Sequence, residues 1–385
     1  MALGPDGTIL ASGGRGAGAL RLLADGALDL SFGDSGFSAL GPADLVSRAI
    51  ARQADGKAVV AGFQTELDSL GGLSFVRLNV DGALDPSFGA GGVLTIEVPG
   101  GAGIFDLAVQ DDGKIVAAGE GQPRFSADCP MVARLTPSGA LDPSFAGGGL
   151  TFYQAPSPGP DVLFGRARAV FLSPDSSLWA VGDGVSLENQ GGFQTIDLLL
   201  LRYRPDGTLD PTSGVNGATY IDYAAPPVEG APNDRDNFAL SVARGDDGRL
   251  VTGGEVYDLF NPTTNRGVVT RHLADGRLDP SFGESGVFVI PELSRIFGVT
   301  VLADDSVMAI GFRLNNEGTA FVDFALHLLA DGTPDAAFGV DGQLDLGAGF
   351  FADSVERQAD GKVLIGGSRA IEGGGSHPFF MRLQR

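Results

Sequence analysis

Short apolar runs alternate with tight polar phrases along the whole chain. In residues 107–119 an apolar run, an Asp-Asp-Gly turn and a second apolar run that ends in glycine follow one another. Asp-Gly between two runs rich in β-branched residues is the strongest short-range signal for a β-hairpin, because both turn residues tolerate a positive φ. The phrase occurs seven times and therefore predicts seven hairpins. Their turn aspartates are Asp6, Asp55, Asp112, Asp175, Asp247, Asp305 and Asp360.

A second phrase, of the type Leu-Asp-Pro-Ser-Phe-Gly, alternates with the hairpins and sets the period. It occurs six times, with spacings of 56, 57, 68, 69 and 56 residues between its aspartates. Five copies carry phenylalanine three residues after the aspartate, and the fourth carries Ser213 instead. The aspartates are Asp29, Asp85, Asp142, Asp210, Asp279 and Asp335, and the phenylalanines are Phe32, Phe88, Phe145, Phe282 and Phe338.

Each period adds two further strands to its hairpin. One contains an Arg-Leu pair, as in residues 75–78, and the other follows the Phe-Gly phrase, as in residues 93–98. Four short strands per period without helical periodicity are typical of a β-propeller blade. We therefore predict an all-β fold, a single seven-bladed β-propeller domain over residues 1–385. The predicted blades are residues 1–41, 46–98, 104–154, 166–223, 237–291, 296–347 and 352–385.

The strand count predicts one gap in this propeller. Seven four-stranded blades need 28 strands and the pattern supplies 27, because the sequence ends on a third strand at residues 380–383. We therefore expect the last blade to lack its outermost strand. Two explanations stay open. Either residues upstream of Met1, including a signal peptide and a strand that fills this place, are missing, or the last blade has three strands and an exposed edge.

Three recurring phrases carry a resemblance to a known repeat. They are Asp-Gly-Lys before an apolar run and glycine, Arg-Leu-x-x-Asp-Gly-x-Leu-Asp, and Ser-Phe-Gly-x-Gly-Gly. They resemble the bacterial delta-60 repeat over essentially the whole chain, and the blade pattern is similar to that of NHL and WD40 repeats. The resemblance implies a β-propeller in which the strand before the Asp-Gly turn is innermost. It also implies a secreted protein in an extracellular, periplasmic or cell-surface location, and it implies no reaction.

Composition excludes several classes of protein. Glycine accounts for 60 of 385 residues and charged residues for 19%, which argues against a helical bundle and against a disordered acidic tail. The formal net charge is −22 and the lysines are only Lys57, Lys114 and Lys362, so nucleic-acid binding is not expected. The single cysteine, Cys129, excludes an internal disulfide framework. No run approaches the ~18 apolar residues of a membrane span.

The repeated aspartate of the Leu-Asp-Pro phrase has a structural interpretation. An aspartate before proline caps a turn, and the following phenylalanine can fill the gap between neighbouring blades. We expect the basic residue of the third strand to pair with this aspartate. Calcium binding is the alternative, although the dense ligand spacing that wraps the ion is missing. The basic residues are Arg21, Arg77, Arg134, Arg202, Arg271, Arg382 and, in the sixth copy, His327.

Catalytic and cofactor motifs are not found in the sequence. His272, His327 and His377 fall on or beside third strands of three different blades, so they cannot meet at one metal ion. No Gly-x-Ser-x-Gly elbow, P-loop or dinucleotide fingerprint occurs. We therefore predict no catalytic residue, no metal centre and no cofactor, with calcium left open as above.

Candidate binding residues come from the places where the copies differ, because function on a repeat scaffold usually lies there. The variable connections are residues 64–73, 120–130, 155–164, 183–195, 224–237, 255–266 and 313–319. On the same face, at the mouth of the central channel, the innermost strands begin with different polar residues. These residues either bind a polar ligand or are a solvated rim. They are Arg48, Asp106, Arg166, Arg168, Asp236, Asn237, Arg295 and Asp353.

Three functional hypotheses follow from this reading. The leading one is a non-enzymatic, monomeric scaffold that binds a protein partner or a polar ligand such as a saccharide, with no nucleic-acid partner and no membrane insertion. The alternative is a hydrolase or lyase with its active site at the channel mouth, around Arg48, Asp106, Arg168 and Asp353. An enzyme needs particular carboxylates with shifted pKa values, whereas a binder tolerates single substitutions. The third is a module of a larger adhesin-like protein.

Overall fold

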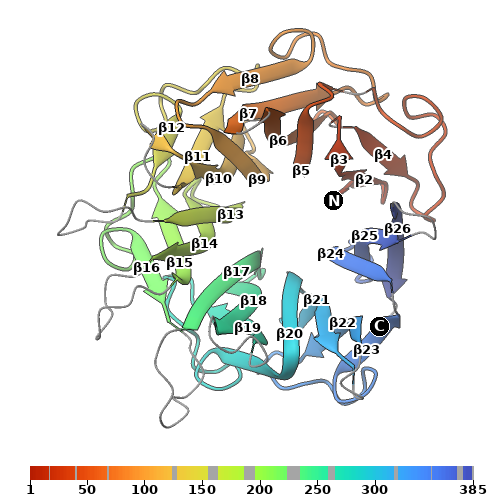
Figure 1. Ribbon diagram of the computed structural model, residues 1–385, viewed down its shortest axis with the longest axis vertical. Helices are drawn as coiled ribbons and strands as arrows, with labels where there is room; N and C mark the ends of the chain where they lie inside the picture. Colours follow the sequence, from red (N-terminus) through yellow and green to blue (C-terminus); the bar gives the residue numbers. More distant parts are fainter. Residues whose placement is uncertain are drawn as a thin grey trace. The chain divides into compact units, whose positions relative to one another are not determined.

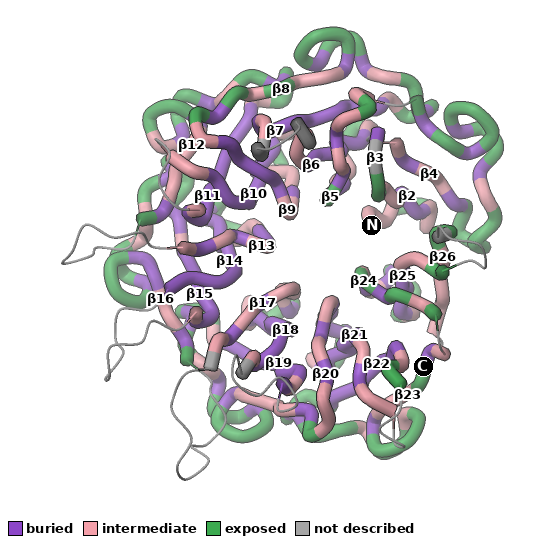
Figure 2. Tube along the Cα trace, viewed as in Figure 1, coloured by how far each residue is buried: buried purple, intermediate pink, exposed green. Residues whose placement is uncertain are grey.

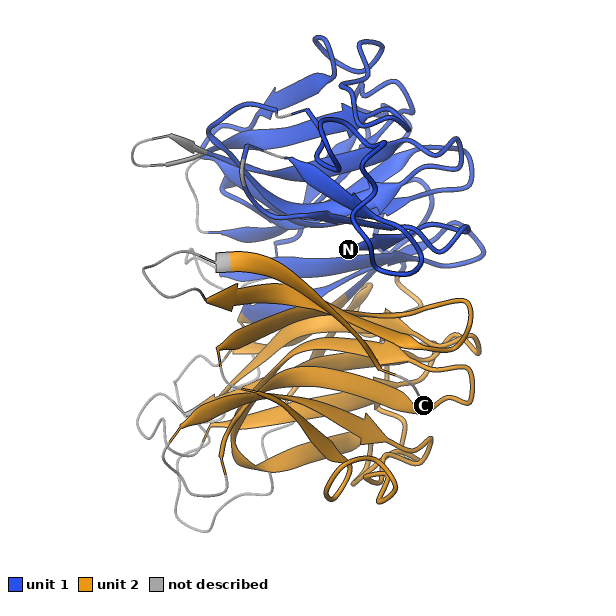
Figure 3. Cartoon of the chain, turned by 90° about the vertical axis from the view of Figure 1, so that its right-hand side faces the viewer, with its two compact units in different colours: residues 1–184, 201–210 blue, residues 185–200, 211–385 orange. Residues whose placement is uncertain are grey.

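A computed structural model describes residues 1–16, 18–39, 41–66, 69–123, 128–154, 164–185, 196–222, 235–258, 265–315, 320–347, 349–370 and 376–383. This part of the chain consists of β-strands and connections without an α-helix (Figure 1). It therefore contains no helix that is long and apolar enough to cross a membrane. The chain divides into two compact units, residues 1–184 with 201–210 (unit 1) and residues 185–200 with 211–385 (unit 2) (Figure 3).

Unit 1 contains three antiparallel sheets, with strand orders β1-β2-β4, β3-β5-β6-β7-β8 and β9-β10-β11-β12. Except at β3, consecutive strands pair, as expected where tight turns connect them. The strands are β1 (Ala2–Leu3), β2 (Ile9–Ser12), β3 (Gly14–Arg15), β4 (Ala19–Leu22), β5 (Leu45–Arg52), β6 (Ala58–Glu66), β7 (Ser69–Leu78), β8 (Val93–Glu97), β9 (Ala102–Val109), β10 (Ile115–Gly121), β11 (Cys129–Leu135) and β12 (Leu150–Phe152).

Unit 2 contains one seven-stranded sheet, in sequential order from β17 to β23, and the three-stranded sheet β24-β25-β26. These strands are β17 (Arg235–Arg244), β18 (Leu250–Asp258), β19 (Arg266–His272), β20 (Val287–Val301), β21 (Val307–Leu314), β22 (Phe321–Leu328), β23 (Gln343–Gly347), β24 (Phe350–Arg357), β25 (Val363–Ala370) and β26 (Ser376–Leu383). The division between the units falls in a further sheet, which contains β13 (Gly165–Leu172), β14 (Leu178–Val185), β15 (Ile196–Tyr203) and β16 (Ala218–Ile221).

The all-β class and the seven predicted hairpins are confirmed. The antiparallel hairpins are β1-β2, β5-β6, β9-β10, β13-β14, β17-β18, β20-β21 and β24-β25. The count of seven four-stranded blades with 27 strands is not confirmed, because the described strands number 26 and form six sheets.

Two local features explain the different count. Strand β20 runs without a break through the predicted boundary between residues 291 and 296, so two predicted blades share one sheet. The segment from Val287 to Val301 contains no turn phrase, and its one proline, Pro291, lies where the register between β19 and β20 shifts, a place where proline is tolerated. In the first repeat, the predicted fourth strand is reduced to a single bridge between Leu20 and Phe37.

The hairpin turns correct the prediction in two details. Only the second turn residue has a positive φ, as at Gly56 (+83°). The preceding aspartate instead accepts a hydrogen bond from the backbone N–H two residues further on, at 3.1 Å from Asp55 Oδ1, which is an Asx turn. In the sixth hairpin the capping aspartate is Asp304 and not Asp305. Asp305 takes the place of the glycine, with a φ of +63°.

The first strand of each hairpin is less buried than the second strand. Strands β10 and β11 are buried along their whole length, whereas β9 and β13 alternate between buried and half-buried residues (Figure 2). Side chains such as Phe75, Ile104 and Met131 form the core between these strands. The first strands therefore carry the partly exposed polar side chains that can meet a ligand.

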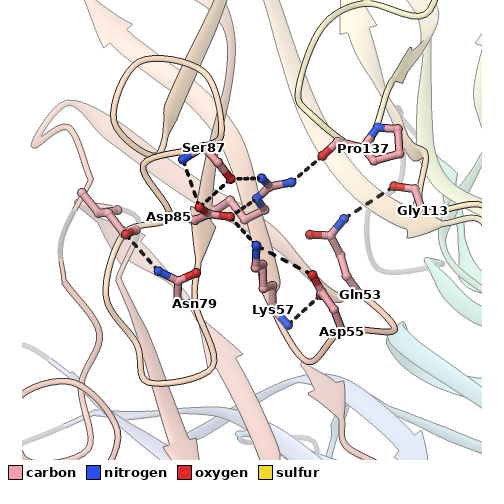
Figure 4. A network of polar contacts seen from close by, with 10 residues as sticks. Gln53, Asp55, Lys57, Asn79, Asp85, Ser87, Gly113 and Pro137 are labelled. Carbon is pink, nitrogen blue, oxygen red and sulfur yellow. Dashed lines mark hydrogen bonds and ion pairs between the residues drawn. The ribbon is translucent and has the colours of Figure 1, made fainter.

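Asp85 lies at the centre of a polar network that recurs along the chain (Figure 4). Its Oδ1 accepts hydrogen bonds from the Ser87 N–H (3.0 Å) and hydroxyl (2.7 Å), and its Oδ2 accepts from Arg77 Nε (2.8 Å) and Lys57 Nζ (2.8 Å). Burial opposes ionisation, but the bonds from Lys57 and Ser87 hold the pKa of Asp85 well below its usual value. Both carboxylate oxygens are thus occupied by protein donors.

The predicted pairing of the third-strand basic residue with the phrase aspartate is confirmed in all six copies of the phrase. The turn-capping interpretation is confirmed in five copies, in which the N–H two residues further on donates to Oδ1 of the aspartate. Besides Arg77–Asp85, the pairs are Arg21–Asp29, Arg134–Asp142, Arg202–Asp210, Arg271–Asp279 and His327–Asp335.

The same arginine and the phenylalanine tie each repeat to the next. Arg134 donates to the carbonyl of Pro205 at 2.6 Å, and its guanidinium lies 4.7 Å from the ring centroid of Phe145. That ring packs against Gly207, where an added Cβ would lie 2.8 Å from Phe145 Cδ2. The phenylalanine therefore fills the gap between repeats, as predicted. Equivalent contacts join Phe32 with Gly82, Phe88 with Gly139 and Phe282 with Gly332.

Two copies of the link deviate where the sequence deviates. In the fourth copy Ser213 replaces phenylalanine, and its hydroxyl lies 3.3 Å from the carbonyl oxygen of Asp275 in the next repeat. In the sixth copy His327 replaces arginine, with Nδ1 2.9 Å from Asp335 Oδ2 and its ring edge-on to Phe338. A polar contact therefore replaces ring packing in one copy, and an imidazole ring replaces the guanidinium in the other.

Candidate ligand-binding site

A β-bulge interrupts the first strand of six hairpins. The pairing register shifts by one residue near the middle of the strand, which leaves one residue without a partner on the second strand. A bulge bends the strand locally and changes the direction of the side chain at that place. The bulged residues are Arg48, Phe105, Arg168, Leu240, Phe297 and Asp353.

The glycine at the end of the second apolar run lies opposite each bulge. A Cβ on Gly182 would lie 1.9 Å from the carbonyl oxygen of Arg166, and a Cβ on Gly119 would lie 1.8 Å from that of Gly103. Backbone atoms cannot yield as a side chain can, so only glycine fits. The repeated glycine therefore permits the bulge, and the bulge orients the residue beside it. The other glycines in this place are Gly62, Gly254, Gly311 and Gly367.

Three charged side chains form the first half of a cluster in unit 1. Arg166, two residues before the bulge of β13, places Nε 2.5 Å from Oε2 of Glu120, which directly follows the hairpin glycine of β10. Its NH2 lies 4.0 Å from Asp128. The Arg166 side chain is 31% exposed and that of Glu120 is 11% exposed. Burial raises the pKa of Glu120, although the Arg166 charge opposes this shift.

Arg168 and Asp183 form the second half. Arg168 Nε donates to Asp183 Oδ1 at 2.5 Å, and the Asp183 side chain is fully buried while Arg168 is 21% exposed. Aromatic rings flank both arginines: Phe105 is 5.8 Å from the Arg168 guanidinium, and Phe164 is 4.6 Å from that of Arg166. We call Arg166, Arg168, Glu120, Asp128 and Asp183 the arginine cluster.

Asp106 has a structural role beside this cluster. Its Oδ1 accepts the Leu107 N–H and its Oδ2 accepts the Val170 N–H of β13, each at 2.8 Å. Desolvation raises the pKa of Asp106 to about 6, and the two amide bonds oppose that shift without cancelling it. Both oxygens are occupied by backbone donors, so this carboxylate joins two strands and is not oriented toward a ligand.

Arg48 and Arg295 each lie beside a phenylalanine ring. Arg48 is exposed and stacks on Phe63, 5.4 Å from the ring centroid. In unit 2, Arg295 pairs with the buried Glu255 and lies 5.9 Å from the ring of Phe297. Arg295 and Glu255 occupy the same places relative to bulge and glycine as Arg166 and Glu120 do, so the pair is a recurring element.

The remaining predicted residues lie in unit 2. Asp236 accepts the Ile196 N–H at 2.9 Å, and burial raises its pKa. Asn237 is buried and donates its side-chain amide to Asp222 (3.1 Å) and Asp197 (3.3 Å). The bulged Asp353 has a pKa raised by burial. Asp236 and Asn237 thus have backbone or buried partners, whereas Asp353 lies at a bulge.

The structure thus brings two of the predicted residues, Arg166 and Arg168, into one cluster. Four of the eight lie in unit 1 and four in unit 2, and their convergence on one channel mouth stays a prediction. Sequence reasoning missed the buried partners Glu120, Asp183 and Glu255. A usable signal existed, because each of these acids directly follows the hairpin glycine.

The variable connections are only partly described. Most of residues 155–164, 183–195, 224–237 and 313–319 and half of residues 255–266 lie outside the described ranges. Residues 64–73, expected to be a loop, are instead largely strand, because β6 extends to residue 66 and β7 begins at residue 69. Within the part of the chain that the structure describes, no three His, Cys, Asp or Glu side chains gather in a manner that could hold a metal ion.

The hairpin repeat and the links between successive repeats define the chain as a β-propeller-type repeat protein. Residues 53–88, 110–145 and 358–385 match the family described as "Domain of unknown function (DUF5122) beta-propeller". The match supports a β-propeller family and does not extend to the delta-60 repeat by name. No curated protein sequence matches the chain.

Several solved structures are similar to this chain at low sequence identity. A protein of unknown function from Dyadobacter fermentans is 13% identical, with 88% of this chain and 94% of that chain covered and a TM-score of 0.49. The polysaccharide lyase Uly1 is 11% identical, with 91% and 84% covered and a TM-score of 0.46. An alpha-L-arabinanase from Penicillium chrysogenum, complexed with arabinobiose, is 9% identical, with 89% and 95% covered and a TM-score of 0.44.

Proposed function

We propose that this chain is a non-enzymatic β-propeller scaffold that binds a neutral saccharide at the arginine cluster. The observation that carries the proposal is the arrangement of Arg166 and Arg168 on β13. Their side chains are partly exposed, each is held by a buried carboxylate, and each has an aromatic ring beside it. The two groups are therefore fixed before a ligand arrives, which lowers the entropic cost of binding.

A sugar ring matches these features chemically. Its vicinal hydroxyls accept and donate hydrogen bonds, and an arginine offers several N–H donors in a fixed plane while its carboxylate partner accepts. The C–H face of a sugar packs on an aromatic ring such as Phe105 or Phe164, in the way that binding sites combine a few polar groups with aromatic walls. The bulge at Arg168 sets the direction in which that side chain points.

The charge of the cluster favours a neutral ligand. Two arginines face three carboxylates, Glu120, Asp128 and Asp183, so the formal sum is 2 − 3 = −1 when all of them are ionised. An anionic saccharide would add like charge to a protein whose formal net charge is −22. We also propose that the chain is a monomer without a cofactor and that it acts outside the cytoplasm, as the repeat resemblance implies.

The hydrolase or lyase alternative has less support from this geometry. It relied on Asp106 as one of its channel-mouth carboxylates, and both oxygens of Asp106 accept backbone amides. Glu120 has a raised pKa, as a general acid requires, but it is paired with Arg166. The alternative predicts loss of turnover in Asp106→Ala or Asp353→Ala with the fold intact.

Titration calorimetry with neutral oligosaccharides tests the proposal. We would titrate cellopentaose, mannopentaose, xylopentaose and arabinopentaose into the protein and repeat the best titration with Arg168→Lys. This substitution keeps the charge and removes the planar fork of donors. Saccharide affinity is expected to fall by about tenfold, which corresponds to ~1.4 kcal/mol of binding free energy.

Arg204→Lys serves as the matched control, because Arg204 is in the same unit and its side chain is 49% exposed. Its affinity is expected to stay within about twofold of the parent. The proposal is wrong if no neutral oligosaccharide binds, or if both variants weaken binding equally. Release of reducing ends during the titration, lost in Asp353→Ala, favours the enzyme instead.

A further inference from the structure

A groove on unit 2 is not part of the arginine cluster. It has a volume of about 700 Å³ and lies between the first part of β20 and the strand β23. Phe288, Val340 and Leu344 are part of its apolar lining, and Val340 is 74% exposed. An apolar lining beside exposed polar side chains is a common feature of recognition sites.

The polar side of the groove is negatively charged. Arg313 and Asp345 form an ion pair at 2.8 Å and neutralise each other. Glu292 and Asp341 also line the groove, and no ion pair is formed by either of them within the described part of the chain. The formal charge of the lining is therefore −2, which favours a cationic ligand group.

Two buried acceptors in this lining lack hydrogen-bond donors. Glu292 Oε2 and Gln343 Oε1 are both buried, and no described residue donates a hydrogen bond to either oxygen. A buried acceptor without a donor is costly, and such groups commonly mark the place of a bound water or ligand. A ligand with several N–H donors would satisfy both.

We propose that this groove binds an arginine side chain carried on an extended peptide segment of a protein partner. A guanidinium presents five N–H donors in one plane, pairs with a carboxylate through two parallel bonds and is weakly hydrated. Its apolar stem would pack on Phe288 and Leu344, while the head meets Glu292. An extended peptide fits because β23 is the last strand of its sheet, so that no described strand pairs with its outer edge.

Three probes separate the parts of this proposal. They are an acetylated and amidated Val-Arg-Val tripeptide, the same peptide with citrulline in place of arginine, and n-butylguanidinium. Citrulline has the shape of arginine and carries no charge, so it isolates the ion pair. Butylguanidinium carries the charged head and a short stem without a backbone, so it distinguishes a free small cation from a peptide. Binding is measured by fluorescence anisotropy for labelled peptides and by competition for butylguanidinium.

Glu292→Gln removes the central carboxylate, and Asp341→Asn removes the second one at a position whose φ of +50° asparagine tolerates. Glu284→Gln is the matched control, because it removes the same charge eight residues away, outside the groove lining. We expect the arginine peptide to bind at least about tenfold more tightly than the citrulline peptide, and Glu292→Gln to weaken it by about tenfold or more. Asp341→Asn is expected to weaken binding less, and Glu284→Gln to leave it within about twofold.

Each other outcome overturns the proposal. Equal affinity for the arginine and citrulline peptides would show that no ion pair contributes to binding. Equal effects of Glu292→Gln and Glu284→Gln would show that the peptide is attracted only by the overall negative charge of the protein. If butylguanidinium binds as tightly as the peptide, the groove binds a small cation, and the edge of β23 contributes nothing to the affinity. If the arginine peptide does not bind saturably to the folded parent protein, the groove is not an arginine-binding site.

Discussion

The ring of Phe88 lies so close to Gly139 that a Cβ on this glycine would be 2.7 Å from Cε2 of the ring. The phenylalanine belongs to one repeat and the glycine to the next, and the ring leaves no room for a side chain at the glycine. The same relationship holds for Phe32 with Gly82 and for Phe282 with Gly332. A local sequence phrase therefore encodes a contact between repeats.

Substitution of Gly139 tests this contact. Gly139→Ala combines a strained φ of +96° with a clash against the Phe88 ring, and we expect it to lower the free energy of unfolding by roughly 2–4 kcal/mol. Gly147→Ala is the control, because Gly147 has a φ of +72° and nothing within 4 Å of the added Cβ. It should cost only the strain, about 1–2 kcal/mol. Urea unfolding of both variants measures the difference. Equal losses in the free energy of unfolding would show that the clash with the Phe88 ring does not contribute.

The paired aspartates make stability depend on acid pH. Burial opposes ionisation of Asp142, yet bonds from Ser144 and the charge of Arg134 hold its pKa at about 2. Because the folded-state pKa is depressed, the stabilisation is present above about pH 4 and is lost as the pH falls toward 2. Asp142→Asn should cost about 3–5 kcal/mol at pH 7, because it leaves Arg134 buried without its charge partner.

The difference in stability between the parent and Asp142→Asn should therefore shrink between pH 4 and pH 2, measured by urea unfolding at each pH. Asp25→Asn is the control, because Asp25 is exposed and only caps a turn through the Ala27 N–H. Its effect on the free energy of unfolding at pH 7 should stay small. A gap for Asp142→Asn that stays constant down to pH 2 would contradict the assigned pKa.

Features that depend on one local phrase could be predicted from the sequence. The hairpins, the pairing of Arg77 with Asp85 and the packing role of Phe88 follow from turn chemistry and from a period that repeats them. Two details could not be predicted in this way: that Asp304 and not Asp305 caps the sixth hairpin turn, and that β20 is unbroken. Each depends on the strand register of a single copy, whereas the repeat pattern gives only the average of all copies.

The candidate site was harder to predict because its partners come from different repeats. Arg166 and Arg168 were found as polar positions at the start of a strand, but the carboxylates that hold them could not be assigned without the strand register. The only sign in the sequence of the bulge that orients Arg168 is a glycine on the neighbouring strand. The contacts of Asp106 could not be predicted either, because the sequence does not reveal that a backbone amide donates to each of its oxygens.

Gly182 is expected to control both stability and the site. In Gly182→Ala the new Cβ would meet the carbonyl oxygen of Arg166 at 1.9 Å, so the bulge must open. We expect a loss of about 3 kcal/mol in the free energy of unfolding, at the upper end for overpacked sites. Gly148→Ala, with nothing within 4 Å and no positive φ, should stay within ~0.5 kcal/mol of the parent.

Saccharide binding by the folded fraction of Gly182→Ala should also weaken, because Arg168 loses the backbone geometry that aims it at the site. Calorimetry at a temperature where both glycine variants are folded measures this effect. Retained binding together with reduced stability would assign the glycine to folding alone and would separate the bulge from the site.

Asp106 gives stability a pH dependence opposite to that of Asp142. Desolvation raises its folded-state pKa to about 6, above the ordinary value, so the folded protein takes up a proton that the unfolded chain releases. This contribution to stability should increase as the pH falls from about 7 through 6 toward 4. Asp106→Asn abolishes the titration, and its stability relative to the parent should decline over that range. Asp111→Asn, at an exposed position, is the control substitution. A flat difference would show that Asp106 does not titrate there and would contradict the raised pKa.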